Sequence, residues 1–203
     1  MVEKTKNMQQ PIKVKMSPTD EELISQFQDG DVYAFEQIVH RYKDPLVNFI
    51  YNYLGNRIDA EDVIQETFLR VFKNKHLYRN IAKFSTWIYT IASNLAKTEL
   101  RRRRRRRIFS LSQMGYGDKD YDVPDTLGSP ERIIGGKMKG QMIRKEIESL
   151  PVKFREVVVL RDIQEFSYEE ISKILNIPIG TVKSRVNRGR LRLQKKLKPL
   201  LDR

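Results

Sequence analysis

The 203-residue sequence contains no cysteine and only two histidines. Without cysteine it can form neither a disulfide nor a thiolate metal site, and His40 and His76 alone cannot complete a zinc site, so we expect no metal and no other cofactor. Long apolar runs are also missing, because none approaches the ~20 residues that span a bilayer, and the N-terminus lacks the apolar segment of a signal peptide. We therefore expect a soluble cytoplasmic protein without membrane insertion, whose residues 1–18 form a disordered tail.

Acidic residues are in the minority. The chain has 39 Lys and Arg against 26 Asp and Glu, a net charge of +13, and its sequence pI is near 9.9. So basic a protein favours a polyanionic partner, and nucleic acid is the simplest one.

The pattern of the chain is helical on both sides of one irregular segment. Residues 19–107 and 137–203 have helical periodicity with short breaks, and no strand pattern persists. Residues 108–136 are rich in Gly, Ser, Asp and Pro, with five acids and two bases. The sequence thus predicts an all-α protein of two small helical domains joined by a flexible acidic linker.

The segment from Ser167 to Leu197 has the pattern of a helix-turn-helix. Ser167 and Glu170 form a capping box that starts a short helix, which stops at the turn around Pro178. A second, basic helix follows, whose apolar side contains Val182, Val186, Leu193 and Leu197 and whose polar side contains Lys183, Ser184, Asn187 and Arg188. A merely solvated helix, or one that binds a membrane surface or an acidic protein, is the alternative. Residues 178–203 hold nine bases and one acid, which favours nucleic acid.

Another amphipathic helix is predicted in the first domain, over residues 59–74. Its buried side contains Ala60, Ile64, Phe68 and Val71, and the opposite side contains Asp62, Gln65, Glu66 and Leu69. An acidic face in a basic protein should repel DNA and suit a protein partner. An ordinary surface helix, with acids near its positive end, is the alternative.

A third helix is predicted over residues 84–107. Its buried stripe is Trp87, Ile88, Ile91 and Leu95, while a polar row comprises Thr86, Thr90, Ser93, Asn94, Lys97 and Arg101. The neighbouring rings of Tyr78, Phe84, Trp87 and Tyr89 could stack on unpaired bases, although a Trp in this position more often belongs to the core. The arginines 101–107 suit a polyanion, or form a solvated helix end.

Three blocks, DAEDVIQETFLRVF, KFSTWIYTIASNLAKTELRRR and LPVKFREVVVLRDIQEFSYEEISKILNIPIGTVKSRVNRGRLRL, occur in this order. Together they resemble the extracytoplasmic-function (ECF) sigma factors of bacterial RNA polymerase, over about residues 20–200. The resemblance implies that residues 19–107 are sigma region 2, which binds core polymerase and melts the minus-ten element. It implies that residues 137–203 are region 4, which reads the minus-thirty-five element.

The resemblance also implies site residues. Asp62, Gln65, Glu66 and Leu69 would dock on the beta-prime clamp helices of the polymerase core. Minus-ten DNA, opened to single strands, would meet Tyr78, Lys83, Phe84, Ser85, Thr86, Trp87, Tyr89, Thr90, Asn94, Lys97 and Arg101. Duplex minus-thirty-five DNA would meet Ser167, Tyr168, Thr181, Lys183, Ser184, Asn187 and Arg188. Residues 155–163 would meet the beta flap, the linker would thread the polymerase cleft, and an anti-sigma factor would hold the protein inactive.

The expected function is therefore promoter recognition and initiation, for a stress or envelope-response regulon, without catalysis. One alternative is an ordinary helix-turn-helix regulator that binds half-sites by itself, with residues 20–107 sensing a ligand or dimerising. An enzyme is not supported, because no phosphate-binding glycine loop, metal-ligand spacing or paired nucleophile is evident.

Overall fold

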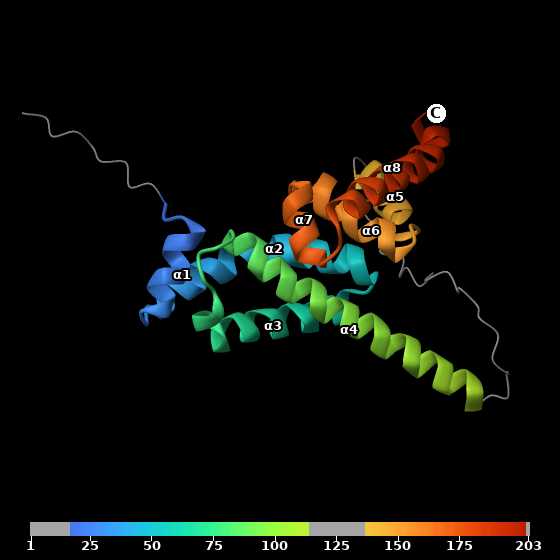
Figure 1. Cartoon of the computed structure of the whole chain (residues 1–203). Coiled ribbons are helices and arrows are strands. Elements are labelled where there is room, and N and C mark those ends of the chain that lie inside the picture. The colour runs from blue at the N-terminus through green and yellow to red at the C-terminus, as the bar shows by residue number, and fades with distance from the viewer. Residues whose placement is uncertain (1–16, 114–136, 202–203) are drawn as a thin grey trace, which may run out of the picture.

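The computed structural model describes residues 17–113 and 137–201 (Figure 1). Within these residues the regular secondary structure is helical, and no strand is present. Lobe 1 comprises α1 (Asp20–Gln28), α2 (Val32–Leu54), α3 (Arg57–Lys73), the 3₁₀ turn η1 (Lys75–Leu77) and α4 (Phe84–Gln113). Lobe 2 comprises α5 (Lys137–Glu148), α6 (Val152–Val158), the π-helical turn η2 (Val159–Ile163), α7 (Tyr168–Leu175) and α8 (Ile179–Leu201). The predicted all-helical class with two units is confirmed.

The helices of lobe 1 start and stop at local signals. Thr19 begins α1 with a capping box, in which its hydroxyl accepts the Glu22 amide at 3.2 Å and the Glu22 carboxylate accepts the Thr19 amide at 2.7 Å. The side-chain oxygens of Asp31 and Asn56 accept backbone N–H groups at the starts of α2 and α3. Gly55 ends α2 at a φ of 67°, a left-handed conformation that favours glycine. These tight connections place α2, α3 and α4 beside one another.

α4 is longer than the sequence suggested. It continues to Gln113, past the boundary expected at Arg107. Of the expected linker, 108–136, and the expected tail, 1–18, only residues 108–113 and 17–18 are described. The remaining linker and tail predictions lie outside the described residues.

Lobe 2 contains the predicted helix-turn-helix. Ser167 and Glu170 form the capping box at the start of α7, and Asn176 ends this helix in the left-handed region with a φ of 53°. α8 begins at Ile179, and its Val182 and Val186 are fully buried, as predicted. The capping and apolar pattern of the sequence was therefore sufficient to locate both helices.

Gly189 marks the closest approach of α8 to α6. A Cβ atom built on it would lie 2.6 Å from Cγ2 of Val158, which is shorter than real contacts allow. The missing side chain therefore lets α8 pack closely on α6.

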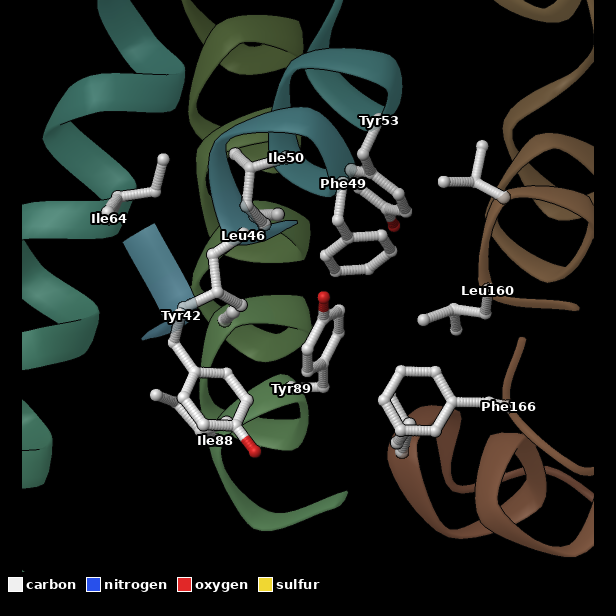
Figure 2. Packing of buried hydrophobic residues seen from close by; sticks show 14 of the residues in the cluster. Tyr42, Leu46, Phe49, Ile50, Tyr53, Ile64, Ile88, Tyr89, Leu160 and Phe166 are labelled. Carbon is white, nitrogen blue, oxygen red and sulfur yellow. The ribbon is translucent and has the colours of Figure 1, made fainter. Parts of the chain in front are cut away.

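The two lobes pack against each other and share one apolar core. Figure 2 shows Tyr89 of α4 between Phe49 of α2 and Phe166 of lobe 2, with ring centroids 5.3 Å and 4.7 Å away. Leu160 of η2 is fully buried at the same contact. Polar bonds also join the lobes: Tyr53 to Glu156 (3.3 Å), Tyr89 to Gln164 (2.6 Å), Lys97 to the Leu175 carbonyl (3.2 Å) and Lys83 to Glu170 (3.0 Å). No pattern in the sequence predicted this contact between the lobes.

Candidate nucleic-acid interface

α3 presents the acidic face that the sequence predicts. Asp62 and Gln65 are exposed, and Glu66 is partly exposed and pairs with Arg70 at 2.8 Å. Leu69 lies among them with 44 % of its surface exposed. The buried side is the predicted one, with Ala60, Ile64 and Val71 in the core and Phe68 half-buried.

Phe72 extends this face, and the sequence analysis missed it. Its ring packs on Phe27 and Phe35, at centroid distances of 5.3 Å and 5.2 Å, yet 45 % of the residue is exposed. Its position three residues after Leu69 was the available signal, because residues at this spacing are neighbours on a helix. Leu69 and Phe72 together form an apolar strip beside the carboxylates.

The loop between η1 and α4 is anchored to α1. Gln28 donates to the carbonyls of Lys75 and Tyr78 at 2.7 Å and 3.0 Å, and the Lys75 ammonium donates to the Phe27 carbonyl at 2.6 Å. The Tyr78 hydroxyl closes the loop by donating to the Ala82 carbonyl at 2.8 Å. The exposed rim of the loop includes Leu77 and Ile81, whose side chains touch little.

The four aromatic residues that we expected to stack on bases have different environments. Tyr78 and Phe84 are buried within lobe 1, where their rings pack edge to face at 5.6 Å. Lobe 1 itself covers both rings in this structure, so neither offers a stacking surface here, and their contact with bases stays a prediction. Trp87 is half-buried beside them. Tyr89 is 2 % exposed because lobe 2 covers it.

The predicted polar row on α4 is only partly accessible. Asn94 and Arg101 are exposed, and Thr90 is half-buried. Thr86 and Ser93 are buried, so the row is not continuous at the surface. Before the row, the half-buried Ser85 and the exposed Lys83 line a hollow whose opposite wall is Gln164, Glu165 and Phe166 of lobe 2. Lobe 2 therefore covers much of the face that we expected to contact opened DNA.

Burial at the contact between the lobes shifts the pKa values of two charged groups, Glu156 and Lys97. Burial raises the pKa of the Glu156 carboxyl, although Lys97, Arg185 and the Tyr53 hydroxyl oppose this effect. Burial lowers the pKa of the Lys97 ammonium. Arg185 pairs with Glu156 at 3.3 Å, so a cation from α8 helps to neutralise a carboxyl buried between the lobes.

The reading side of α8 is open to solvent. Lys183, Ser184, Asn187 and Arg188 are exposed on one side of the helix, and Thr181 is half-buried at its start. The predicted residues of this helix are thus brought together on one accessible surface, since its apolar side packs inward.

The start of α7 lies beside this surface and also meets lobe 1. Ser167 and Tyr168 are half-buried, and the Lys183 ammonium lies 5.9 Å from the centroid of the Tyr168 ring. Burial would raise the pKa of Glu170, but its bonds from Ser167 and its pair with Lys83 outweigh burial and lower the pKa. Glu170 therefore serves both as a helix cap and as a link to lobe 1.

Residues 155–163 are less accessible than a flap contact requires. Arg155 to Leu160 are all buried, and only Asp162 and Ile163 are classed as exposed. In this arrangement the apolar residues of the segment form the core of lobe 2 and the contact with lobe 1, so only its end at Asp162 and Ile163 is exposed, and the flap contact of the whole segment stays a prediction.

Two surveys of the described residues complete the site. No group of three or more His, Asp or Glu side chains among them is placed to hold a metal ion. No helix within residues 17–113 or 137–201 is both long and apolar enough to cross a membrane.

Comparison with known proteins relates both lobes to one family. Residues 38–106 match Sigma-70 region 2, and residues 140–193 match Sigma-70, region 4. The chain is 40 % identical to the ECF RNA polymerase sigma factor SigW of Bacillus subtilis, covering 87 % of this chain and 96 % of that protein. It is 32 % identical to the ECF RNA polymerase sigma-E factor of Haemophilus influenzae, covering 90 % and 97 %. The sigma factor RpoE of Bartonella quintana, solved in complex with the anti-sigma factor NepR, superposes with a TM-score of 0.61 at 27 % identity, covering 81 % and 96 %.

Proposed function

We infer a division of labour between the lobes from one premise: this chain belongs to the ECF sigma factors of RNA polymerase. It directs core polymerase to promoters and thereby initiates transcription. In this proposal lobe 1 holds the polymerase and opens the minus-ten element, and lobe 2 reads the minus-thirty-five element. Both steps use binding energy, and no residue is assigned a catalytic role. The promoters belong to a stress or envelope-response regulon, and the protein works in the cytoplasm.

The docking face on lobe 1 is the surface of α3 that contains Asp62, Gln65, Glu66 and Leu69, extended by Phe72. In a chain of net charge +13, carboxylates on an exposed face attract a basic partner and repel DNA. The adjoining apolar strip supplies buried area on binding. We assign this face to the beta-prime clamp helices of the polymerase, and this surface is the observation that carries the proposal.

Opening of the minus-ten element requires the lobes to separate. Asn94 and Arg101 are exposed and can contact DNA, whereas Tyr89 becomes accessible only when lobe 2 moves away. Each broken base-pair step costs about 1.4 kcal/mol of stacking. Base-aromatic stacking returns ~1–3 kcal/mol per base, so a few captured bases offset several broken steps. We propose that docking on polymerase holds the lobes apart and makes this capture possible.

Recognition of the minus-thirty-five element uses α8. Lys183, Ser184, Asn187 and Arg188 would enter the major groove, as the second helix of a helix-turn-helix does. Ser167, Tyr168 and Thr181 lie at helix starts, where backbone and hydroxyl donors suit phosphates. The flap contact would use Asp162 and Ile163, the exposed end of residues 155–163.

An anti-sigma factor is the expected inhibitor. The Bartonella quintana relative was solved in complex with one, NepR. We propose a partner of the same kind for this chain. It would act by stabilising the lobe contact, because that contact already covers part of the minus-ten face.

The docking face is tested by reversing one charge. Asp62→Arg should abolish promoter-dependent transcription by purified core polymerase, because the exposed carboxylate would become a cation facing a basic partner. Asp44→Arg, an equal charge change at an exposed position of α2, is the matched control and should leave transcription intact. Duplex minus-thirty-five binding should survive in both variants. Unchanged transcription with Asp62→Arg would overturn the assigned face, and tight palindrome binding without polymerase would favour a simple regulator instead.

A further inference from the structure

The second half of α4 carries a run of arginines that the docking and promoter-reading scheme leaves unexplained. α4 projects beyond the other helices at this end (Figure 1). Arg101, Arg102, Arg104, Arg105 and Arg106 are exposed there. Like charges three and four residues apart destabilise a helix, so this density is unfavourable unless a polyanion compensates.

Arg103 differs from its neighbours and has a structural role. Its side chain is 20 % exposed, it donates to the Leu54 carbonyl at 3.0 Å, and it pairs with Asp59. It therefore joins the end of α2 to the start of α3. Arg102, by contrast, pairs with Glu99 of its own helix at 2.7 Å.

The helical register sorts the remaining arginines. At about 100° per residue, Arg104 and Arg105 lie within ~60° of the mean direction of Asn94, Lys97 and Arg101, whereas Arg102 and Arg106 lie more than ~100° from it. Arg103 lies about 180° from Asn94, which agrees with its contact to the body of lobe 1. Arg102 and Arg106 fall on a third side. One uninterrupted stripe therefore runs from the predicted minus-ten residues to Arg105.

We propose that Arg104 and Arg105 bind the phosphates of duplex promoter DNA just upstream of the minus-ten element. This inference rests on the proposed function, because it needs α4 to lie on that element. With a rise of 1.5 Å per residue, Arg105 lies about 16 Å beyond Asn94, which is about five base pairs of duplex. The contact would fix the position of the helix on the DNA without reading sequence.

The chemistry of the stripe favours duplex DNA over a single strand. Single strands are bound by cations together with aromatic side chains on which bases stack. From Thr90 to Ile108 the sequence has no aromatic residue. Guanidinium groups alone suit a phosphate backbone, which they can bind with two parallel hydrogen bonds.

The test compares two double variants in the full chain bound to core polymerase. Arg104→Ala with Arg105→Ala removes two charges from the stripe, and Arg102→Ala with Arg106→Ala removes two charges from the other side of the same turns. Affinity is measured against salt concentration on a promoter with its complete upstream duplex, and on a fork template that keeps the minus-ten single strand but lacks that duplex.

The stripe variant should bind the complete promoter more weakly. The slope of log affinity against log salt should fall by about 1.8, that is by 0.9 for each phosphate contact. The control pair should keep the slope, and the fork template should bind both variants as it binds the unmodified chain. Because the fork retains the minus-ten strand, normal fork binding shows that the proposed function is intact whatever happens upstream.

Three results would overturn the proposal. An equal loss of slope in the control pair would mean diffuse attraction rather than a defined contact. An equal loss on the fork template would place the arginines at the single strand. If the unmodified chain also failed to bind the minus-ten strand, the proposed function itself would be wrong. An unchanged slope in the stripe variant would mean that another partner, such as the acidic residues of the same chain between 114 and 136, neutralises the stripe.

Discussion

The two helices that we assign to DNA, α4 and α8, differ in how much of their reading face is open. On α8 the polar residues Lys183 and Arg188 are exposed. On α4 the polar row is interrupted, because Thr86 and Ser93 are buried, and lobe 2 covers the neighbouring Tyr89. The comparison indicates that the free chain is ready for the minus-thirty-five element but not for the minus-ten element.

The difference has a simple origin in packing. α8 has one apolar side, around Val182 and Val186, which packs inward and leaves the polar side free. α4 is buried on more than one side, because Ile88 and Ala92 lie in the core while Tyr89 contacts Phe166 of the other lobe. Because α4 lies between the other helices of lobe 1 and lobe 2, its Tyr89 side cannot contact DNA until lobe 2 moves.

The largest expected effect comes from weakening the layer that covers α4. Phe166→Ala removes the ring that packs on Tyr89, and truncating a buried Phe costs about 3–5 kcal/mol. The free chain should then bind a single-stranded minus-ten oligonucleotide more tightly, as measured by fluorescence anisotropy. Phe35→Ala, which removes a ring from lobe 1 away from Tyr89, should bring no such gain. If Phe166→Ala abolishes duplex binding by α8, the variant has unfolded lobe 2 and the milder Phe166→Leu should be used for the same measurement.

The next largest effect comes from the packing of α8 against α6 at Gly189. Gly189→Ala should destabilise the chain by about 1–3 kcal/mol and weaken duplex binding, because the new Cβ would meet Val158. Gly180→Ala, where nothing lies within 4 Å, is the matched control and should keep full stability. Adding Val158→Ala should partly rescue Gly189→Ala. Thermal unfolding measures all three, and equal stability of both glycine variants would contradict the close approach.

Recognition by α8 should be lost residue by residue. Arg188→Ala or Lys183→Ala should weaken minus-thirty-five binding by ~1–3 kcal/mol if the residue contacts a base edge, and less selectively if it contacts phosphate. Competition with altered promoter sequences separates the two cases. Lys195→Ala, exposed farther along α8, should reduce affinity equally on all sequences. Equal losses on all sequences for Arg188→Ala would show that α8 only positions the lobe.

The smallest effect is a dependence of stability on pH. Because burial raises the pKa of Glu156, its contribution to stability is present below its unfolded pKa, about 4.3, and is lost as the pH rises through its higher folded value. Relative to the parent, Glu156→Gln should therefore be more stable at about pH 7.5 than at about pH 4, since groups common to both proteins cancel. Denaturant unfolding at both values tests this. Parallel changes in the two proteins would exclude a role for Glu156.

Local sequence patterns predicted the helices and the sides that they bury. The capping box at Ser167 and the valines of α8 are recognisable within a few residues, because they act between neighbours in the chain. They also predicted the acidic face around Asp62, since an amphipathic helix separates its buried and exposed residues by period alone.

Contacts between distant segments could not be predicted in this way. Tyr89 and Gln164 are far apart in sequence, and no short pattern marks them as partners. For the same reason Phe84 was assigned to bases, although its ring packs on Tyr42 of α2, 5.5 Å away between centroids. Arg103 likewise cannot be distinguished from its neighbours until the end of α2 is placed beside it.

The fastening of the loop before α4 has a consequence for how promoter preference can change. Gln28 and Tyr78 hold both ends of this loop by hydrogen bonds, so less conformational entropy would be lost if the loop bound a nucleotide, as the proposed function requires of this region. Substitutions confined to Arg79–Ala82 would change the middle of the loop, while the hydrogen bonds of Gln28 at its start stay in place. The loop lies between Tyr78 and Lys83, which are predicted to meet minus-ten DNA, so on that assignment these four residues could be exchanged to select another base while the supporting helices stay unchanged.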